Sequence, residues 1–276
     1  MINKRVFYIV STPIGNIDDI SYRAVKVLRE VDFIACEDTR KTGLLLKSLN
    51  ITNKLIPLHD HNESTKTEHI SNLLDADNNI ALVSDAGTPL ISDPGYKLVN
   101  FLQNKGYKVK AVPGACAAIA ALSVSGLPTD RFAFEGFLPS KDAARKNKLE
   151  SLAAEPRTMV FYESPRRIMS TLSAVKEIYG EDRQVAVARE LTKTFESIYY
   201  GSIVSLLEKV KNDDNFAKGE IVLIIKGCES NKLDVPQVAI DAVQILKQDI
   251  SLSKSVTLSA KIFNLRKNKL YEACIK

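Results

Sequence analysis

Carboxylate, hydroxyl and glycine residues that could bind a ligand are concentrated in residues 84–95, SDAGTPLISDPG. This segment follows the apolar run IALV at residues 80–83, which predicts a buried strand. Its twelve residues include two glycines, two prolines and two aspartates. Glycine lets the backbone approach a ligand and proline stiffens a loop, so this composition favours a binding loop over an ordinary strand-to-helix turn.

Similar polar segments follow the other predicted strands in the first half of the chain. They are residues 11–16, 37–40, 57–62 and 113–115. In a parallel sheet these segments and residues 84–95 would all lie along the carboxyl edge, where open α/β folds bind their ligands. Five such segments in succession predict a binding site at that edge, without identifying a reaction.

Several common motifs are missing from the sequence. No Gly-x-Gly-x-x-Gly follows the first predicted strand, and neither Gly-x-x-x-x-Gly-Lys-Ser/Thr nor Gly-x-Ser-x-Gly occurs. These absences count against a dinucleotide site, a P-loop and a serine hydrolase. His59 and His61 flank Asp60, but two histidines without further clustered ligands favour hydrogen-bonding loop residues. No metal site is therefore predicted.

Strand-like and helix-like segments alternate along the chain, which predicts an α/β fold with a parallel-type sheet and covering helices. The predicted strands are residues 5–10, 32–36, 54–56, 80–83 and 108–112, followed by 131–137, 157–162, 184–190 and 220–225. The predicted helices are residues 22–31, 42–49, 65–76, 96–104 and 115–124, followed by 142–153, 165–179 and 202–212.

A chain of 276 residues exceeds the usual size of one domain, so more than one is expected. The segment GLPTD at residues 126–130 marks a boundary, and a third piece starts after the segment CESNK at residues 228–232. We predict α/β domains at residues 1–126 and 127–229, and a C-terminal helical module at 230–276. The module's three helix-like segments, residues 238–247, 252–263 and 267–275, resemble a helix-turn-helix.

The positive charge is unevenly distributed. The whole chain carries a net charge of +5, and residues 251–276 alone account for it with six lysines and arginines against one glutamate, 6 − 1 = +5. Residues 141–148 hold a second basic cluster. Basic patches on an otherwise neutral body favour a polyanionic partner, although a solvated helix face with a frayed tail would give the same pattern.

The composition is that of a soluble globular protein, with 45% hydrophobic and 26% charged residues. The apolar run at the N-terminus is too short for a signal peptide or a membrane span. The four cysteines are widely scattered and form no Cys-x-x-Cys pair, which favours reduced thiols. Together these features predict a cytoplasmic protein with no membrane association.

Five motifs together resemble a known family. They are STPIGNIDDI at residues 11–20, CEDTR at 36–40, SDAGTPLISDPG at 84–95, FYESP at 161–165 and RELTK at 189–193. In order and spacing they are similar to those of the tetrapyrrole-methylase-like (class III) S-adenosyl-L-methionine methyltransferases, and among them to the bacterial enzymes that act on small-subunit ribosomal RNA. The resemblance spans essentially the whole chain.

The resemblance implies two α/β domains of the tetrapyrrole methylase type with the cofactor, S-adenosyl-L-methionine, in the cleft between them. It implies 2′-O-methylation of a cytidine ribose in 16S ribosomal RNA near the decoding centre, on the RNA alone or on the assembled 30S subunit, by a homodimer. Two alternatives stay open: a methyltransferase of the same fold acting on a small tetrapyrrole-like substrate, and a non-catalytic RNA-binding factor in ribosome assembly. The basic clusters count against the first alternative, and the intact 84–95 loop counts against the second.

The resemblance also assigns cofactor-binding residues in both α/β domains. They are Pro13, Asp85, Gly87, Thr88, Ala115, Cys116, Tyr162, Leu191 and Glu220. Physically, Gly87 permits close approach and the Asp85 carboxylate could accept a hydrogen bond from the methionine ammonium. The alternative is that such residues only shape turns.

A ribose hydroxyl is a poor nucleophile at neutral pH, so a general base or a polarising cation would assist the reaction. The candidates are Asp38, Arg40, His59, Asp60, Glu163, Glu190 and Lys193. We favour Asp38, Arg40 and Lys193 as the catalytic residues. The alternatives are a plain Asp38–Arg40 or Glu37–Arg40 ion pair that closes the turn and, for Lys193, either a lowered pKa or a phosphate contact.

Substrate contacts are predicted from Asn16 and His59 and from the basic clusters. The cluster residues expected to bind phosphates are Arg145, Lys146, Lys148, Lys267 and Lys269.

Overall fold

The computed structural model describes residues 5–59, 62–211, 213, 215–228, 235–263 and 265–275. The chain forms two compact units, Met1–Gly227 and Cys228–Lys276. Asp60, one of the predicted catalytic candidates, and His61 lie outside the described residues.

The first sheet of the larger unit is entirely parallel, as predicted. Its strands are β1 (Val6–Val10), β2 (Phe33–Cys36), β3 (Lys54–Pro57), β4 (Ile80–Val83) and β5 (Lys108–Val112), in the order β3-β2-β4-β1-β5. The connecting helices are α1 (Tyr22–Glu30), α2 (Thr39–Ser48), α3 (Glu63–Asp75) and α4 (Tyr96–Asn104), and a short 3-10 helix, η1 (Ile17–Asp19), precedes α1. This arrangement brings the carboxyl ends of all five strands to one edge.

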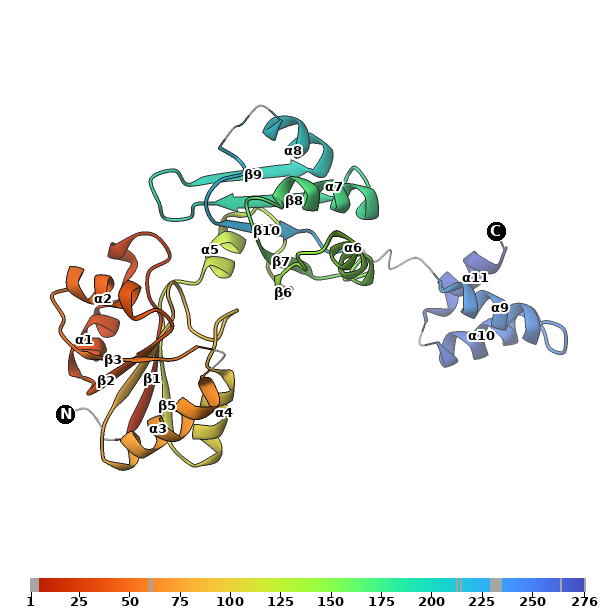
Figure 1. Ribbon diagram of the computed structural model, residues 1–276. Helices are drawn as coiled ribbons and strands as arrows, with labels where there is room; N and C mark the ends of the chain where they lie inside the picture. Colours follow the sequence, from red (N-terminus) through yellow and green to blue (C-terminus); the bar gives the residue numbers. More distant parts are fainter. Residues whose placement is uncertain are drawn as a thin grey trace. The chain divides into compact units, whose positions relative to one another are not determined.

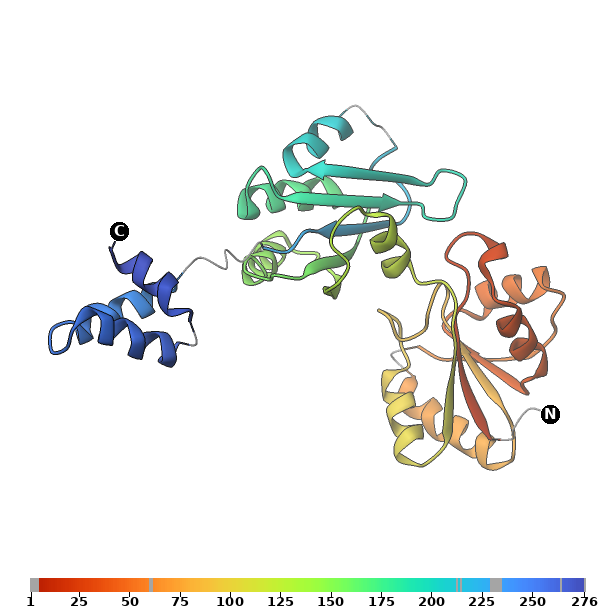
Figure 2. The ribbon, with the colours of Figure 1, turned by 180° about the vertical axis from the view of Figure 1, so that it is seen from behind.

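Side-chain alternation along β1 shows why helices cover both faces of this sheet. Val6, Tyr8 and Val10 pack with α1 and α2, whereas Phe7, between them, packs with α3 and α4 on the opposite face. The two helical layers flank the sheet in the view of Figure 1 and again from behind in Figure 2. Burial on both faces is what a parallel sheet requires.

The second sheet is mixed, which corrects the expectation of parallel strands throughout. Its strands are β6 (Phe132–Phe137), β7 (Thr158–Glu163), β8 (Gln184–Arg189), β9 (Ser197–Ser202) and β10 (Ile221–Ile225), in the order β6-β7-β10-β8-β9. β10 runs antiparallel to both β7 and β8. β10 is buried along its whole length, so its residues would be apolar whether it ran parallel or antiparallel to its neighbours, and its sequence does not reveal the strand direction. The start of β10 consequently lies at the same edge as the ends of β6, β7 and β8.

β9 was not predicted from the sequence. It is an edge strand that pairs only with β8, and most of its residues are half-buried. An edge strand of this kind lacks the strong apolar pattern by which buried strands are recognised.

Helices from both halves of the unit cover the second sheet. α6 (Asp142–Ser151), α7 (Ile168–Tyr179) and α8 (Ile203–Val210) contribute the side chains that pack with one face. α5 (Ala117–Val124) packs on the other face, where Ala118, Ala121 and Leu122 meet Val160 and Val222. α5 thus precedes residue 126 in the sequence but packs on the second sheet.

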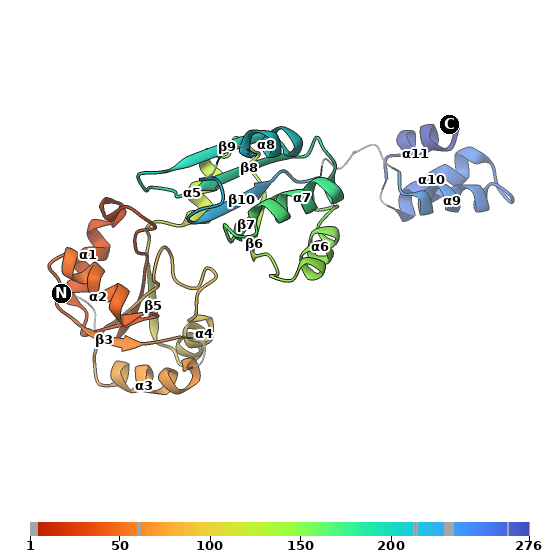
Figure 3. The same ribbon diagram turned by 45° about the horizontal axis from the view of Figure 1, so that its top comes forward.

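The smaller unit consists of α9 (Gln237–Leu246), α10 (Leu252–Ile262) and α11 (Lys267–Ile275). Figure 3 shows these three helices packed together, and their core contains Ala239, Val243, Val256, Ala260 and Leu270. Across the described parts of both units, the helices are too short or too polar to cross a membrane.

Candidate active site

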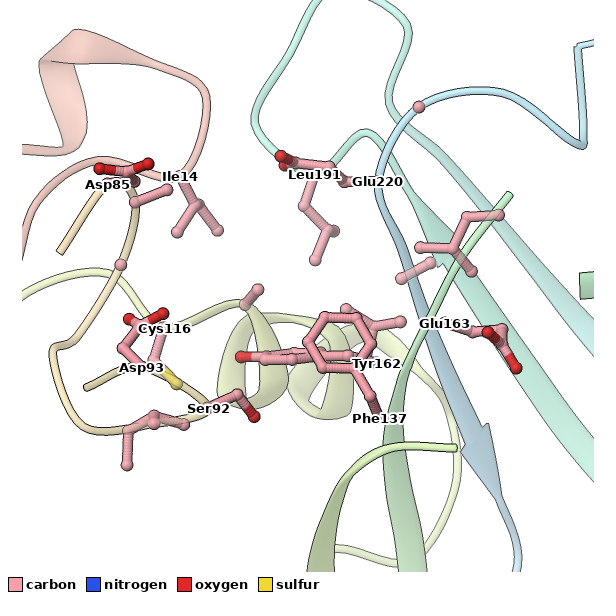
Figure 4. Close-up of a pocket in the computed structure, with 18 of the residues that line it drawn as sticks. Ile14, Asp85, Ser92, Asp93, Cys116, Phe137, Tyr162, Glu163, Leu191 and Glu220 are labelled. Carbon is pink, nitrogen blue, oxygen red and sulfur yellow. The ribbon is translucent and has the colours of Figure 1, made fainter. Parts of the chain in front are cut away.

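A cavity of about 400 Å³ opens where the carboxyl edge of the first sheet meets the second sheet. Residues that follow β1, β4 and β5 line one side, which we call the first wall: Ile14, Asp85, Gly87, Thr88, Asp93 and Cys116. Phe137, Tyr162, Leu191 and Glu220 line the opposite side, the second wall. Figure 4 shows labelled members of the two groups facing each other across the space.

Hydrogen bonds join three loops into the first wall. The backbone N–H of Thr12 donates to the Gly87 carbonyl at 2.8 Å, and the Gly87 N–H donates back to Thr12 at 3.1 Å. The Thr88 hydroxyl donates to the Ala115 carbonyl at 2.9 Å and lies 2.9 Å from the Ser11 hydroxyl. The loops after β1, β4 and β5 therefore form one rigid support.

Gly87 is required where the first wall comes closest to the cavity. Its φ of +83° lies in the left-handed region, and a Cβ there would sit 3.3 Å from Cγ2 of Ile14. A side chain at this position would thus be strained and would press on a neighbouring residue of the wall.

Asp85 connects the first wall to a fourth loop, the one after β2. Its carboxylate accepts a hydrogen bond from the backbone N–H of Asp38 at 3.1 Å and forms an ion pair with Lys41 at 2.8 Å. The Asp85 side chain is 23% exposed to solvent. Asp85 is thus held in place while its surface remains accessible from the cavity.

The second wall is mainly aromatic and apolar. The Tyr162 ring makes edge-to-face contacts with Phe134 and Phe137, at centroid distances of 5.0 and 5.4 Å. Burial raises the pKa of the Tyr162 hydroxyl, which therefore stays protonated. Leu191 adds an aliphatic surface that is only 9% exposed. Such a wall suits the flat, weakly polar part of a ligand.

A cluster of charged side chains, centred on Lys193, lies beside the second wall. Lys193 donates hydrogen bonds to Glu190 at 2.8 Å and to Glu220 at 3.1 Å. Burial alone would lower the pKa of the Lys193 amine, but the hydrogen bonds to the two glutamates outweigh burial and raise this pKa. The alternative of a lowered pKa at Lys193 is therefore wrong, and the amine remains a cation.

A close approach links the loop after β1 with the loop after β8. A Cβ on Gly15 would lie 2.5 Å from Cγ of Lys193 and 3.0 Å from the Leu191 carbonyl oxygen. Only glycine allows the two loops to pack at this distance, so Gly15 helps to bring Leu191 to the cavity.

The carboxylate of Asp93, which lines the cavity, has a pKa that is shifted toward neutral pH. Burial, with repulsion from Glu37 and Asp85, raises the pKa of Asp93 to about 6, although a hydrogen bond with Ser84 acts in the opposite direction.

The structure brings seven of the nine predicted cofactor-binding residues to the cavity. These are Asp85, Gly87, Thr88, Cys116, Tyr162, Leu191 and Glu220. Pro13 and Ala115 are immediate neighbours of lining residues in the sequence.

The three predicted catalytic residues lie beside the cavity lining. Asp38 caps α2 by accepting a hydrogen bond from the Arg40 N–H, and the Arg40 guanidinium also pairs with its carboxylate at 2.8 Å. These bonds lower the pKa of Asp38. The Arg40 side chain is 88% exposed, and Lys193 reaches the cavity through Glu220.

The predicted substrate residues are not gathered at the cavity. The Asn16 side chain caps η1, and His59 interacts with Asn62. Arg145 is 3% exposed and pairs with Asp142, so its guanidinium is inside the protein. Lys146 pairs with Glu177 at 2.7 Å and Lys148 with Glu135 at 2.9 Å. Lys267 is exposed and Lys269 is half-buried, both in α11.

Sequence reasoning missed several lining residues, among them Ile14, Ser92, Asp93, Phe137 and Ala188. Ser92 and Asp93 lie within the segment that was singled out, but the segment alone did not show that they line the cavity or that Asp93 is half-buried. Phe137 is the last residue of a predicted strand, β6, and the carboxyl end of that strand lies at the cavity. In the described part of the chain, His, Cys, Asp and Glu residues form no group of three or more that could hold a metal ion.

The chain belongs to the tetrapyrrole (corrin/porphyrin) methylase family, whose model matches residues 6–207. The fold and the cavity between the two sheets are thus those of a methyltransferase family.

Within this family the chain is most informatively compared with two curated proteins. It is 50% identical to the ribosomal RNA small subunit methyltransferase I of Vibrio cholerae serotype O1, over 97% of this chain and 93% of that protein. It is 49% identical to the protein of the same name from Escherichia coli O157:H7, over 98% and 94% of the two chains.

Solved structures resemble the fold at much lower identity. A cobalt precorrin-4 methyltransferase superposes with a TM-score of 0.59 at 16% identity, over 80% of this chain and 94% of the other. A diphthine synthase gives 0.60 at 13%, over 80% and 90%. These likenesses concern the fold alone.

Proposed function

We propose that this protein transfers a methyl group from S-adenosyl-L-methionine to the 2′-hydroxyl of a cytidine in 16S ribosomal RNA, near the decoding centre. The observation that carries the proposal is the near-full-length identity of about 50% to relatives named for methylation of small-subunit ribosomal RNA. The choice of cytidine, of the 2′ position and of the decoding centre rests on the family resemblance of the five motifs.

The cavity fits the proposed methyl donor in size and in the distribution of polarity. A volume of about 400 Å³ falls in the range of small-molecule sites. The first wall offers the Asp85 carboxylate for an ammonium group, and the second wall offers Tyr162 and Leu191 for an adenosine. The absence of a Cβ at Gly87 leaves room for a ligand close to the backbone. When bound, the donor supplies an electrophilic methyl group on a sulfonium.

The protein's own contribution is then positioning and charge. The first-wall loops are tied to one another, so Asp85 and Thr88 keep their places when a ligand binds. Burial of the donor between the walls excludes water from the reacting centre. Methyl transfer requires the nucleophile and the methyl carbon to be in line, and a rigid cavity supplies that orientation.

We propose that RNA is held outside the cavity by exposed cations. Arg40 is the best-placed of these, because it is exposed and its neighbour Lys41 pairs with Asp85 of the first wall. Lys267, which is exposed in the smaller unit, would add a phosphate contact. Arg145 is removed from this set by its burial. Lys146 and Lys148 contribute less because each is much less exposed than Arg40 and is also paired with a glutamate.

The proposal is tested by mapping 2′-O-methyl groups in 16S ribosomal RNA. Purified protein and methyl-labelled donor are incubated with 30S subunits, or with free 16S RNA, from cells that lack this protein, and the RNA is analysed by nuclease digestion and mass spectrometry. We expect one added methyl on a cytidine ribose. Label in a base, or in no RNA while a tetrapyrrole is methylated in a parallel reaction, would contradict the proposal.

We also propose, from the family resemblance, that the protein acts in the cytoplasm as a homodimer. Light scattering of the purified chain tests the second point. The chain mass is 30.5 kDa, so a homodimer would give about twice that value.

A further inference from the structure

Four carboxylates line the cavity, and three of them are paired with cations. Asp85 pairs with Lys41 at 2.8 Å, Glu163 with Arg167 at 2.8 Å and Glu220 with Lys193 at 3.1 Å. Asp93, the fourth, has no ion-pair partner among the residues that the structure describes. A paired carboxylate is a weaker base than an unpaired one that is partly withdrawn from water.

Glu163 is the clearest contrast with Asp93. Its carboxylate accepts hydrogen bonds from the Thr171 hydroxyl at 2.7 Å, the Arg167 guanidinium at 3.0 Å and the Ser164 N–H at 2.6 Å. These bonds use its acceptor capacity to hold the start of α7. Glu163 therefore has a structural task, although it was among the candidates for catalysis.

The loop that carries Asp93 is strained. Leu90 and Ser92 have φ values of 72° and 66°, a left-handed conformation that is costly for residues with a side chain. The loop also reaches the second sheet, since a Cβ built on Gly136 of β6 would lie 3.5 Å from the Ser92 hydroxyl. Strain of this kind persists only where the surrounding structure holds the loop in place, and this loop carries Asp93 into the cavity lining.

Charged and titratable groups on several elements surround Asp93. Glu37, after β2, and Asp85, after β4, disfavour its ionised form, while Ser84 hydrogen-bonds to it. Tyr162 of β7 and Cys116, before α5, lie on the facing sides of the cavity. The charge of Asp93 contributes to the raised pKa of the Tyr162 hydroxyl, so the two groups lie close enough to interact electrostatically.

We propose that Asp93 is the general base that takes the proton from the substrate hydroxyl during methyl transfer, an inference that rests on the proposed function. As the hydroxyl attacks, a lone pair of its oxygen forms the new oxygen–carbon bond, its proton moves to a carboxylate oxygen of Asp93, and the O–H electron pair stays on the ribose oxygen. The methyl–sulfur pair stays on the sulfur, which becomes a neutral thioether. Asp93 then returns its proton to solvent through the open side of the cavity.

The first experiment compares Asp93→Asn with wild type in single-turnover methyl transfer to 30S subunits. We expect the rate of transfer to fall ~100-fold or more, the size of a general-base contribution, with donor affinity by calorimetry within a few-fold of wild type. Asp182→Asn, which removes an exposed carboxylate in the turn before β8, is the matched control and should leave both quantities unchanged.

The second experiment follows ionisation directly, without turnover. In the donor-free protein labelled with ¹³C-carboxyl aspartate, the NMR resonance that is lost in Asp93→Asn should titrate with a midpoint near pH 6. Glu37→Gln removes a repelling charge, so it should move this midpoint to lower pH. The acidic limb of the transfer rate should shift in the same direction, which a merely structural role of Asp93 would not produce.

The possible outcomes separate this inference from the proposed function. If Asp93→Asn transfers methyl groups at the wild-type rate, or loses donor affinity as much as rate, Asp93 is not the base. A midpoint near pH 4 that Glu37→Gln does not move would also overturn the inference. Absence of methyl transfer by the wild-type protein would instead remove the proposed function, and the role of Asp93 with it.

Discussion

The two walls of the cavity differ in chemistry because they come from sheets of different construction. The first wall consists of loops after parallel strands, joined by backbone and hydroxyl hydrogen bonds, and it contains the carboxylates Asp85 and Asp93. The second wall comes from the ends of β6 and β7 and from the segments after β8 and before β10, and its surface is mainly the aromatic and aliphatic side chains of Phe137, Tyr162 and Leu191, with Glu220 beside them.

This difference suggests a division of tasks. The first wall would orient the charged end of the donor and the reacting hydroxyl, and the second wall would bury the adenosine. Substitutions in the first wall should therefore affect either donor affinity or chemistry, depending on the group that is removed, whereas those in the second wall should affect donor affinity alone.

The largest effect is expected for Asp85→Ala in the first wall. The change removes a carboxylate for the donor's ammonium and frees Lys41, so donor affinity should fall ~100-fold, in line with the loss of a charged hydrogen bond. Calorimetry with S-adenosyl-L-methionine measures the effect. Binding of RNA should change much less, and an equal loss of both affinities would contradict the assignment of Asp85 to the donor.

A smaller effect is expected for Leu191→Ala in the second wall. Loss of this apolar surface should weaken donor binding ~10-fold, about 1.4 kcal/mol, while the transfer rate at saturating donor stays near wild type. Leu207→Ala, on α8 away from the cavity, is the control for general loss of packing. A fall in the saturated rate as large as the loss of affinity would abolish the distinction between the walls.

The third prediction concerns stability as a function of pH. Because the folded state raises the pKa of Asp93 to about 6, ionisation of this group costs stability as the pH rises from about 4 through 6. Asp93→Asn should therefore be more stable than wild type at pH 7.5, by ~1 kcal/mol after allowance for partial exposure, or ~2–4 °C in Tm. The difference should vanish near pH 4.

The same measurement on Asp38→Asn should show a change in folding stability of the opposite sign. Hydrogen bonds from Arg40 lower the pKa of Asp38, so its contribution is present above the ordinary pKa and is lost as the pH falls. This variant should be less stable than wild type at pH 7.5. Equal shifts for both variants would mean that neither carboxylate has the environment described.

The smallest effect is expected outside the cavity. Lys267→Gln in α11 should weaken RNA binding a few-fold and reduce the slope of log affinity against log salt by ~1, as for the loss of one phosphate contact. Arg145→Gln should lower Tm instead and leave the salt slope unchanged, since that guanidinium is buried. Filter binding over a range of salt concentrations distinguishes the two.

The first sheet could be predicted from the sequence almost to the residue. Its strands are short apolar runs bounded by polar segments, and the segments after them meet at one edge because the strands are parallel. α2 nevertheless starts at Thr39 rather than at residue 42, since Asp38 caps it.

The second sheet was less predictable for two physical reasons. The run IVLII of β10 has no polar face, so its sequence carries no information about strand direction. A parallel β10 would have put Glu220 at the edge away from the cavity, and the assignment of Glu220 came only from the family resemblance. Asp93 was overlooked because its place in the cavity, opposite Tyr162, depends on how segments that are distant in the sequence come together.

The position of β10 has a consequence for synthesis of the chain. This strand is the last of the second sheet to leave the ribosome, yet it lies in the middle, between β7 and β8. Until residue 225 has emerged, β7 and β8 each present an unpaired hydrophobic edge that favours association with other chains. A nascent or prematurely terminated polypeptide would therefore be prone to aggregate, although its N-terminal strands could already have paired.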